Sequence, residues 1–292
     1  MQMTFPIAVT GATGVQGGAL ARLLLDRGQP VRALTRSPGS AAARELRRRG
    51  AEVAYADFDD AGSLDAGLRG CRALFLMGTP FGTDTATEVR QGRAAIDAAV
   101  RAGVGQLVYS SVAHADRATG VPHFDSKYQV ELHLAGTELN WTVLGPGKFM
   151  DNYAGGWSAG LLRQGRLALP LSADRPVALV CAADIAGMAA LALAEPDRLA
   201  RVRVDIAGDE RTPLDQAGTF ARAVGRPVTF ERVPDEVARG YGHDLAAMFG
   251  YFDTVGLDVD TAALRTAYPE VGWHTFEDWV AAQDWSHVRG AA

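Results

Sequence analysis

The sequence predicts an α/β protein in which helices flank a doubly wound parallel sheet. Up to about residue 150, short apolar or β-branched runs alternate with longer segments of helical period, as in successive strand–helix–strand units. A glycine-rich turn joins the first run to the first helical segment. Four helical segments end at glycines that can adopt the left-handed cap conformation, namely Gly28, Gly50, Gly70 and Gly103. Right-handed crossovers between parallel strands then give the doubly wound arrangement.

The elements follow in order from this pattern. Strands are expected at residues 7–10, 31–35, 52–56, 73–77, 106–110 and 141–144. Helices are expected between them at residues 15–27, 41–49, 63–68, 87–101 and 126–134. After residue 150 the sequence is mixed and rich in glycine, until a strand–helix unit resumes the earlier rhythm at residues 177–193. A strand at 203–207 and a helix at 213–224 follow.

This order of elements predicts two parts. We expect residues 1–150 to form the sheet domain, with residues 177–195 returning to it. Residues 151–176 and 196–292 are expected to form a smaller C-terminal α/β lobe beside the carboxyl edge of the sheet.

Composition and charge exclude several classes of protein. Of the 292 residues, 48% are apolar and 22% are charged, which suits a protein with a large core. The net charge is −5, and the basic run at residues 44–49 contains Glu45 and Leu46, so it indicates a solvated helix face rather than a nucleic-acid surface. The longest apolar run, residues 177–194, is interrupted by Asp184 and is too short to span a bilayer comfortably. No signal-peptide pattern precedes the first strand, so we expect a cytoplasmic protein.

Two cysteines, Cys71 and Cys181, lie in apolar surroundings without metal-ligand spacing. We expect buried thiols of a reducing compartment, with neither a disulfide nor a bound metal.

The turn after the first strand reads TGATGVQGG and has the spacing G-x-x-G-x-x-G. A tight strand-to-helix turn needs positive φ, a pyrophosphate must approach bare backbone, and the start of a helix offers unpaired N–H groups. A glycine-rich turn can also be empty, but its position between strand and helix favours a dinucleotide site. The expected binding residues are Gly11, Thr13, Gly14, Val15, Gln16 and Gly17.

The tip of the second strand indicates which dinucleotide is bound. The segment ALTRSP places Arg36 and Ser37 where NAD-binding proteins carry a carboxylate for the ribose 2′-OH. A guanidinium instead pairs bidentately with a 2′-phosphate. The sequence therefore predicts NADP(H), unless Arg36 is only a solvated loop residue.

Two further strand ends carry candidate contacts. Asp57 and Phe58 follow the third strand and could meet the edge and face of an adenine, although a helix N-cap region and a core aromatic explain them equally well. Gly78 and Thr79 follow the fourth strand, at the edge where the middle of the cofactor should lie. A plain turn is nearly as good an interpretation of that pair.

Several segments together resemble the NmrA-like family, in the atypical branch of the short-chain dehydrogenase/reductase superfamily. They are TGATGVQGG, LTRSP, AEVAYADFDD, VYSSV, PHFDSKYQVE, LGPGKFMDN and HDLAAMFGYFD, and they are spread over most of the chain. The resemblance implies a Rossmann domain with a smaller substrate-side lobe and NADP(H) binding. It also implies either activity like that of bacterial quinone reductases or a role as an NADPH sensor.

The resemblance further implies catalytic residues. Active short-chain dehydrogenases carry Tyr-x-x-x-Lys after the fifth strand, and the matching positions here are His123 and Lys127. Lys127 is expected to hold the nicotinamide ribose, and Ser111, with Ser110, to orient a carbonyl. His123 either donates the proton that the missing tyrosine would supply, or only caps the helix or faces solvent. His114 is an outside candidate that we expect to be exposed.

The segment after the sixth strand, residues 145–152, is expected to pass beneath the nicotinamide. There Pro146 would shape the backbone and Phe149 would close the pocket, while Lys148 and Asn152 either contact substrate or lie on the surface. The acceptor pocket is expected to draw on apolar side chains that could each also be core residues, namely Phe81, Phe149, Tyr153, Trp157, Met248, Phe249 and Phe252.

Two functions stay open at this point. In the first, NADPH reduces a small carbonyl, quinone or related acceptor, and loss of the tyrosine matters least for a quinone. In the second, the chain holds NADP(H) without turnover and regulates a protein partner. We favour the oxidoreductase, expect no nucleic-acid or membrane partner, and consider a homodimer compatible with the sequence.

Overall fold

The computed structural model describes residues 5–289, except for the side chain of Trp157, one of the side chains expected at the acceptor pocket. The chain divides into two units, and each is described by itself. The first unit comprises the residues up to 118 together with 123–145 and 185–204. The second comprises residues 119–122, 146–184 and those from 205 onward.

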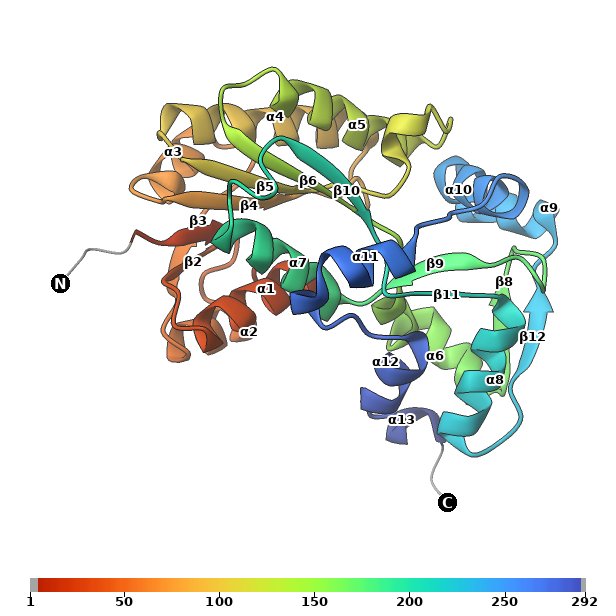
Figure 1. Ribbon diagram of the computed structural model, residues 1–292. Coiled ribbons are helices and arrows are strands. Elements are labelled where there is room, and N and C mark those ends of the chain that lie inside the picture. The colour runs from red at the N-terminus through yellow and green to blue at the C-terminus, as the bar shows by residue number, and fades with distance from the viewer. Residues whose placement is uncertain (1–4, 290–292) are drawn as a thin grey trace. The chain divides into compact units, whose positions relative to one another are not determined.

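A seven-stranded sheet forms the centre of the first unit (Figure 1). Its strands in chain order are β1 (Ile7–Val9), β2 (Val31–Thr35), β3 (Glu52–Tyr55), β4 (Ala73–Met77), β5 (Gln106–Ser110), β6 (Asn140–Pro146) and β10 (Val202–Ile206). The spatial order is β10-β6-β5-β4-β1-β2-β3, and β1 pairs in parallel with both β2 and β4. The strand order therefore reverses at β1, and in open sheets of this kind ligands bind at the carboxyl ends beside such a switch point.

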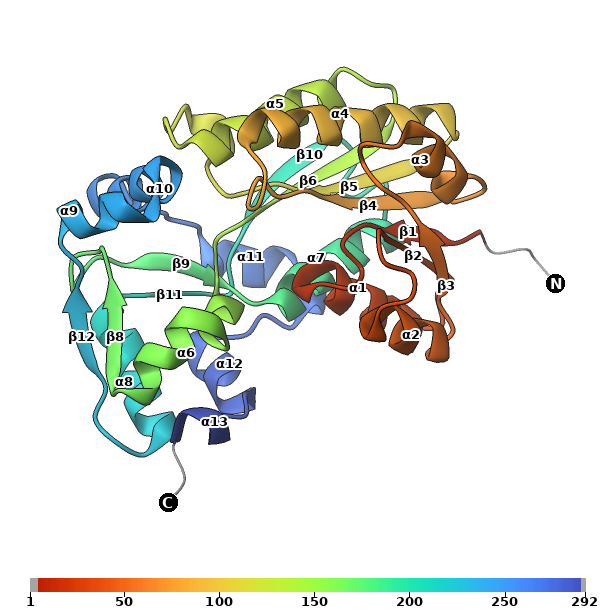
Figure 2. The same ribbon diagram turned by 180° about the vertical axis from the view of Figure 1, so that it is seen from behind.

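Helices cover both faces of this sheet (Figures 1 and 2). One face carries α1 (Val15–Asp26), α2 (Ala41–Arg48) and α7 (Ala182–Ala194). The other carries α3 (Ala61–Leu68), α4 (Thr85–Arg101) and α5 (Pro122–Ala135), and a short 3-10 turn, η1 (Ala115–Arg117), precedes α5. The predicted Rossmann-like α/β fold is thus confirmed.

Local signals in the sequence set these helix ends and helix contacts. The four glycines expected to end helices all have positive φ, between +66° at Gly103 and +99° at Gly50. The helices α4 and α5 approach closely at Gly92, where an added Cβ would lie 2.7 Å from the Val130 side chain. The same layer buries apolar residues of α3 and α5 such as Leu64 and Leu134.

The start of α5 differs from the expectation. The helix begins at Pro122 rather than at residue 126, because proline has the φ of a helix and its missing N–H is not needed in the first turn. His123 and Lys127 therefore lie on one helix, four residues apart, where side chains share a face.

The expected return of residues 177–193 to the large sheet is wrong for the strand. This strand, β9 (Val177–Val180), pairs with β7 (Lys148–Phe149) in parallel and with β11 (Asp209–Arg211) antiparallel. The strand that borders β6 is instead β10. An apolar run such as VALV predicts a buried strand but does not specify its partners, since pairing depends on residues far apart in the sequence.

The second unit contains the three-stranded sheet just described and a parallel pair, β8 (Arg166–Leu169) with β12 (Thr229–Arg232). Its helices are α6 (Gly156–Arg163), α8 (Pro213–Val224), α9 (Asp235–Ala238), α10 (His243–Thr254), α11 (Thr261–Ala267), α12 (Phe276–Ala282) and α13 (Ser286–Arg289). Its 3-10 segments are η2 (Met150–Tyr153), η3 (Arg239–Tyr241) and η4 (Pro269–Val271). No helix within residues 5–289 combines the length and apolar character needed to cross a membrane.

Aromatic side chains build the core of this second unit. Phe220 makes edge-to-face contacts with Tyr153, Phe276 and Trp285, with ring centroids 5.3 to 5.4 Å apart. Each such pair contributes about 0.5–1.5 kcal/mol beyond the burial of its area.

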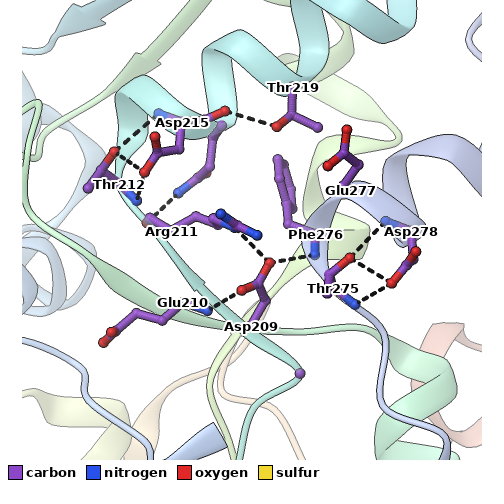
Figure 3. A network of polar contacts seen from close by, with 12 residues as sticks. Asp209, Glu210, Arg211, Thr212, Asp215, Thr219, Thr275, Phe276, Glu277 and Asp278 are labelled. Carbon is purple, nitrogen blue, oxygen red and sulfur yellow. Dashed lines mark hydrogen bonds and ion pairs between the residues drawn. The ribbon is translucent and has the colours of Figure 1, made fainter. Parts of the chain in front are cut away.

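Polar contacts fix the two helix starts around this core (Figure 3). Thr212 and Asp215 form a capping box at the start of α8, and Thr275 and Asp278 form another at α12. The carboxylate of Asp209 accepts a hydrogen bond of 2.8 Å from the backbone amide of Phe276, which ties β11 to α12. These contacts satisfy helix-end amides that would otherwise have no partner.

Candidate functional site

The turn between β1 and α1 leaves the start of the helix open. Gly11 has a φ of +59°, and a Cβ at Gly17 would lie 2.4 Å from the carbonyl oxygen of Thr10. The helix starts after Gly14, which offers no side chain to cap it, and both Gly11 and Gly14 are exposed, with Thr13 half-buried between them. Because the first amides of a helix have no partner within it, this geometry suits an anion such as a pyrophosphate.

Two side chains fasten this turn to the neighbouring strands. The Thr10 hydroxyl donates to the carbonyl oxygen of Phe75 at 3.2 Å and accepts from the amide of Met77 at 2.8 Å. The buried Gln16 donates from Nε2 to the Ser110 hydroxyl at 2.5 Å. Gln16 therefore already has a protein partner, whereas Val15 is 58% exposed.

Arg36 and Ser37 follow β2 and are exposed. Within residues 5–289 the Arg36 guanidinium forms no hydrogen bond or ion pair. Its charge acts on Asp59, whose pKa is lowered chiefly by a hydrogen bond from Arg90 and only slightly by Arg36. The guanidinium is thus available to an anionic ligand.

Asp57 and Phe58 have structural roles in this conformation. The Asp57 carboxylate accepts from the backbone amide of Asp59 at 3.0 Å, and its own amide donates to the Ser63 hydroxyl at 2.9 Å. Phe58 packs against the core of the first unit. Contact of either residue with an adenine stays a prediction.

Lys127 lies in a buried ion pair with Glu88 of α4. Its Nζ is 2.7 Å from Oε1 of Glu88, whose side chain is only 2% exposed, and it also donates to the carbonyl oxygen of Gly78 at 3.1 Å. The hydroxyl of Ser126 donates to the other carboxylate oxygen at 2.5 Å. An ammonium has three donors, so these two bonds leave one N–H of Lys127 for a further acceptor. The lysine also links α5 to the Gly78–Thr79 end of β4, where Thr79 is exposed.

His123 is buried, with 6% of its surface exposed, so the alternative that it faces solvent is wrong. The centroid of its ring is 4.7 Å from that of Phe124 and 5.8 Å from that of Phe81. The Phe81 side chain is itself 61% exposed. The helix α5 starts four residues earlier than expected and carries His123 within its first turn. His123 therefore contacts an accessible aromatic side chain, that of Phe81.

His114 was expected to be exposed and is fully buried. Its backbone is left-handed, with φ of +65°, and its neighbours Ala113 and Ala115 are buried as well. This part of the loop after β5 therefore packs against the protein interior, which the polar side chain of His114 did not predict.

The two serines after β5 have different partners. Ser110 accepts the hydrogen bond from Gln16 and so belongs to the glycine-rich turn. The Ser111 hydroxyl donates to the buried carboxylate of Glu131, which also accepts from Arg203 at 2.9 Å. Burial raises the pKa of Glu131, and the Arg203 charge opposes this effect. Ser111 thus joins an ion-pair network, and a role in orienting a carbonyl stays a prediction.

In the second unit, Pro146 is buried, and Lys148 and Phe149 form β7 and are half-buried. The Nζ of Lys148 donates to the Tyr153 hydroxyl at 2.5 Å and lies 3.9 Å from the centroid of that ring. The Tyr153 hydroxyl in turn donates to Oε1 of Gln216 at 2.5 Å. Burial lowers the pKa of Lys148 to about 7 and raises that of Tyr153. The sequence analysis singled out Lys148 and Tyr153 separately, but no sequence signal indicated that they contact each other.

The side chains expected to line an acceptor pocket differ in accessibility. Tyr153 and Phe252 are core residues, with 1% and 2% exposed. Met248 and Phe249, both on α10, are half-buried. Those two and Phe149 therefore keep surface that a ligand could contact.

A cluster of possible metal ligands also lies in the second unit, formed by Cys181, Asp184 and His274. His274 Nδ1 is 2.6 Å from the Asp184 carboxylate, a direct hydrogen bond between the two side chains. Burial raises the pKa of the Cys181 thiol to about 12. The contact between Asp184 and His274 links the start of α7 to the segment before α12.

Comparisons with known proteins identify the family of the chain. The model of the NmrA-like family matches residues 3–280. A (4-alkanoyl-5-oxo-2,5-dihydrofuran-3-yl)methyl phosphate reductase from Streptomyces griseus is 34% identical over 235 residues, covering 80% of this chain and 79% of the relative. An NAD(P)H azoreductase from Xenophilus azovorans is 30% identical with the same coverage.

A solved structure shares the fold over nearly its whole length. The NADPH-dependent quinone oxidoreductase from Escherichia coli, solved in complex with NADPH, is 27% identical, with a TM-score of 0.79 and coverage of 94% of this chain and 98% of that one. Since the family model spans almost the entire sequence and the relatives match most of their own lengths, the chain belongs to the NmrA-like family.

Proposed function

We propose that the chain binds NADP(H) at the turn between β1 and α1 and reduces a small carbonyl, quinone or related acceptor. The observation that carries this proposal is the open start of α1, reached through a turn in which Gly17 has no room for a side chain. The reductases among its relatives, and the NADPH in the Escherichia coli quinone oxidoreductase, support it.

Arg36 favours NADP(H) over NAD(H). It is exposed at the tip of β2, has no ion pair within residues 5–289, and no acidic residue stands in that segment to accept from a ribose hydroxyl. Its guanidinium would bind the 2′-phosphate, which NAD(H) lacks.

Lys127 would hold the nicotinamide ribose through its remaining N–H donor, because Glu88 and Gly78 fix its other two. The bound nicotinamide would supply hydride to the acceptor. We further propose that the second unit is the substrate-side lobe, with Phe149 and α10 offering its apolar surface.

The test is a set of binding and turnover measurements on the purified chain. NADPH should bind, and its absorbance should decay in the presence of at least one member of a panel of quinones, aldehydes, ketones and imines. If NADPH binds and none of the panel is reduced, the second candidate function gains support, namely an NADP(H) sensor that acts through a protein partner. That candidate is favoured by one observation, the histidine at position 123 where active dehydrogenases carry tyrosine.

The role of His123 is tested by His123→Phe, which keeps the ring contacts with Phe81 and Phe124 but has no proton to donate. If His123 is the acid, carbonyl turnover should fall by about 10²-fold or more while the NADPH affinity stays unchanged. Unchanged carbonyl turnover would assign the proton to another group.

A further inference from the structure

An ion pair is buried between two helices of the first unit. Glu88 of α4 is 2% exposed and Lys127 of α5 is 9% exposed, and the Nζ of the lysine is 2.7 Å from Oε1 of the glutamate. Two further features favour the charged form of Glu88. Its other oxygen accepts from the Ser126 hydroxyl at 2.5 Å, and it lies in the first turn of α4, where the helix dipole stabilises a negative charge.

The charge of Lys127 is balanced by this one carboxylate. Within the part of the chain that the structure describes, Glu88 is the only anion within ion-pair distance of the ammonium. The other buried carboxylate on α4 and α5 is that of Glu131, and it lies 2.9 Å from the Arg203 guanidinium. Removal of the Glu88 charge would therefore leave an unbalanced cation at position 127.

The pair lies at the edge of the sheet that carries the proposed cofactor site. The Lys127 ammonium donates to the carbonyl oxygen of Gly78, the residue that directly follows β4. The preceding residue, Met77, is fastened to the glycine-rich turn. Its amide donates to the Thr10 hydroxyl at 2.8 Å, and a Cβ at Gly11 would lie 2.5 Å from its sulfur. The ammonium is thus beside the turn after β1, and all of these residues belong to the first unit.

The order of the strands indicates which half of a dinucleotide would lie near the ammonium. In the proposed function, Arg36 after β2 binds the 2′-phosphate of the adenosine, and the turn after β1 binds the pyrophosphate. The strands β2 and β4 pair with β1 on its opposite sides. A dinucleotide that extends from β2 across β1 therefore continues towards the end of β4, which places its nicotinamide half on the side of Lys127.

We propose that Glu88 determines how strongly this site discriminates between the reduced and the oxidised coenzyme. This inference rests on the proposed function and concerns binding alone. The nicotinamide ring of NADP⁺ carries a positive charge that NADPH lacks, and like charges repel each other more strongly where little water screens them. Because Glu88 offsets the Lys127 ammonium, NADP⁺ binds without the penalty that an unbalanced cation would impose.

The test measures the dissociation constants of NADP⁺ and NADPH by calorimetric titration in the unmodified chain and in Glu88→Gln. Glutamine has the size of glutamate but no charge, so the ratio of the NADP⁺ constant to the NADPH constant should rise at least about tenfold, a difference of about 1.4 kcal/mol. Mildly acidic pH keeps the proton on the Lys127 amine in the variant. An equal loss of affinity for both coenzymes would overturn the inference, because a purely structural role of Glu88 affects both alike.

Two control variants keep the negative charge. Glu88→Asp retains a carboxylate, and Ser126→Ala removes one hydrogen bond to the carboxylate of Glu88. In both variants the ratio of the two dissociation constants should stay that of the unmodified chain, even where both affinities fall. A ratio that rises in these controls as it does in Glu88→Gln would show that packing, and not charge, sets the discrimination, and would overturn the inference.

Lys127→Met makes the opposite change of charge and decides the question if Glu88→Gln does not fold. It leaves the Glu88 carboxylate without its ammonium, so at neutral pH the ratio of the NADP⁺ constant to the NADPH constant should fall, although both affinities weaken. An unchanged or higher ratio would overturn the inference while leaving the proposed function intact. If the unmodified chain binds neither coenzyme, the proposed function is contradicted, and this inference with it.

Discussion

The two units differ in the partners of their lysine side chains. In the first unit two buried polar side chains beside the proposed cofactor site have protein partners: Lys127 pairs with Glu88, and Gln16 with Ser110. In the second unit Lys148 is half-buried with no counter-charge within the described residues. The ion pair fixes the position of the Lys127 ammonium, whereas burial lowers the pKa of Lys148 to about 7. Lysine therefore forms a buried ion pair at position 127 and a titratable group at position 148.

The largest expected effect comes from removing the counter-charge in the first unit. Glu88→Gln leaves the Lys127 ammonium buried without an anion, which should cost about 3–5 kcal/mol of unfolding free energy. Urea denaturation measures this loss. The control is Asp65→Asn, which breaks an exposed ion pair with Arg101 and should cost less than about 1 kcal/mol. Equal losses of unfolding free energy in the two variants would contradict the claim that the buried ion pair of Lys127 with Glu88 stabilises the fold more than an exposed pair does.

A smaller loss of stability is expected from a substitution in the glycine-rich turn of the first unit. Gly17→Ala places a Cβ 2.4 Å from the Thr10 carbonyl oxygen and 2.6 Å from that of Gly11, and backbone cannot yield as a side chain does. We expect a loss of about 1–3 kcal/mol in stability together with weaker NADPH binding. Gly39→Ala, with no atom within 4 Å of the added Cβ, should change neither measurement. Tight NADPH binding by the Gly17 variant would contradict the proposed approach of pyrophosphate to this turn.

The last effect is the pH dependence of stability, which is small per pH unit and tests the lysine of the second unit. The pKa of Lys148 is about 7 in the folded chain and 10.5 in a solvated lysine, so between these values the unfolded state binds more protons. Stability should therefore rise with pH across this window, by at most about 1.4 kcal/mol per pH unit from this group. Lys148→Met should be more stable than the unmodified chain at pH 7 and should lack this contribution to the slope. Parallel stability profiles for the two proteins would remove the case for an uncompensated amine.

Much of the first unit could be predicted from sequence because its signals are local. Period, glycine caps and the turn after β1 depend on neighbouring residues, and the bounds of β2, β4 and β5 agree with the expectation to the residue. The exposed Arg36 followed from its position at a strand end. The partners of β9 could not be predicted, since an apolar strand is compatible with several sheets.

Side-chain partners were the least predictable part of the candidate site. His114 was expected outside and is buried, and the hydrogen bond from Ser111 to Glu131 was not predicted. Both outcomes depend on residues brought together by the fold, 20 positions apart in the case of Ser111. The environment of Lys148 arises in the same way, from Tyr153 and from Gln216 on a distant helix.

The most direct test of the central claim compares the dissociation constants of NADPH and NADH by fluorescence titration, in the unmodified chain and in Arg36→Gln. NADPH should bind at least about tenfold more tightly than NADH, a difference of about 1.4 kcal/mol, and the variant should lose this preference. Arg47→Gln, which changes another exposed arginine, should keep it. Equal dissociation constants for the two coenzymes in the unmodified chain, or a preference that persists without Arg36, would contradict the assignment of the 2′-phosphate to this guanidinium.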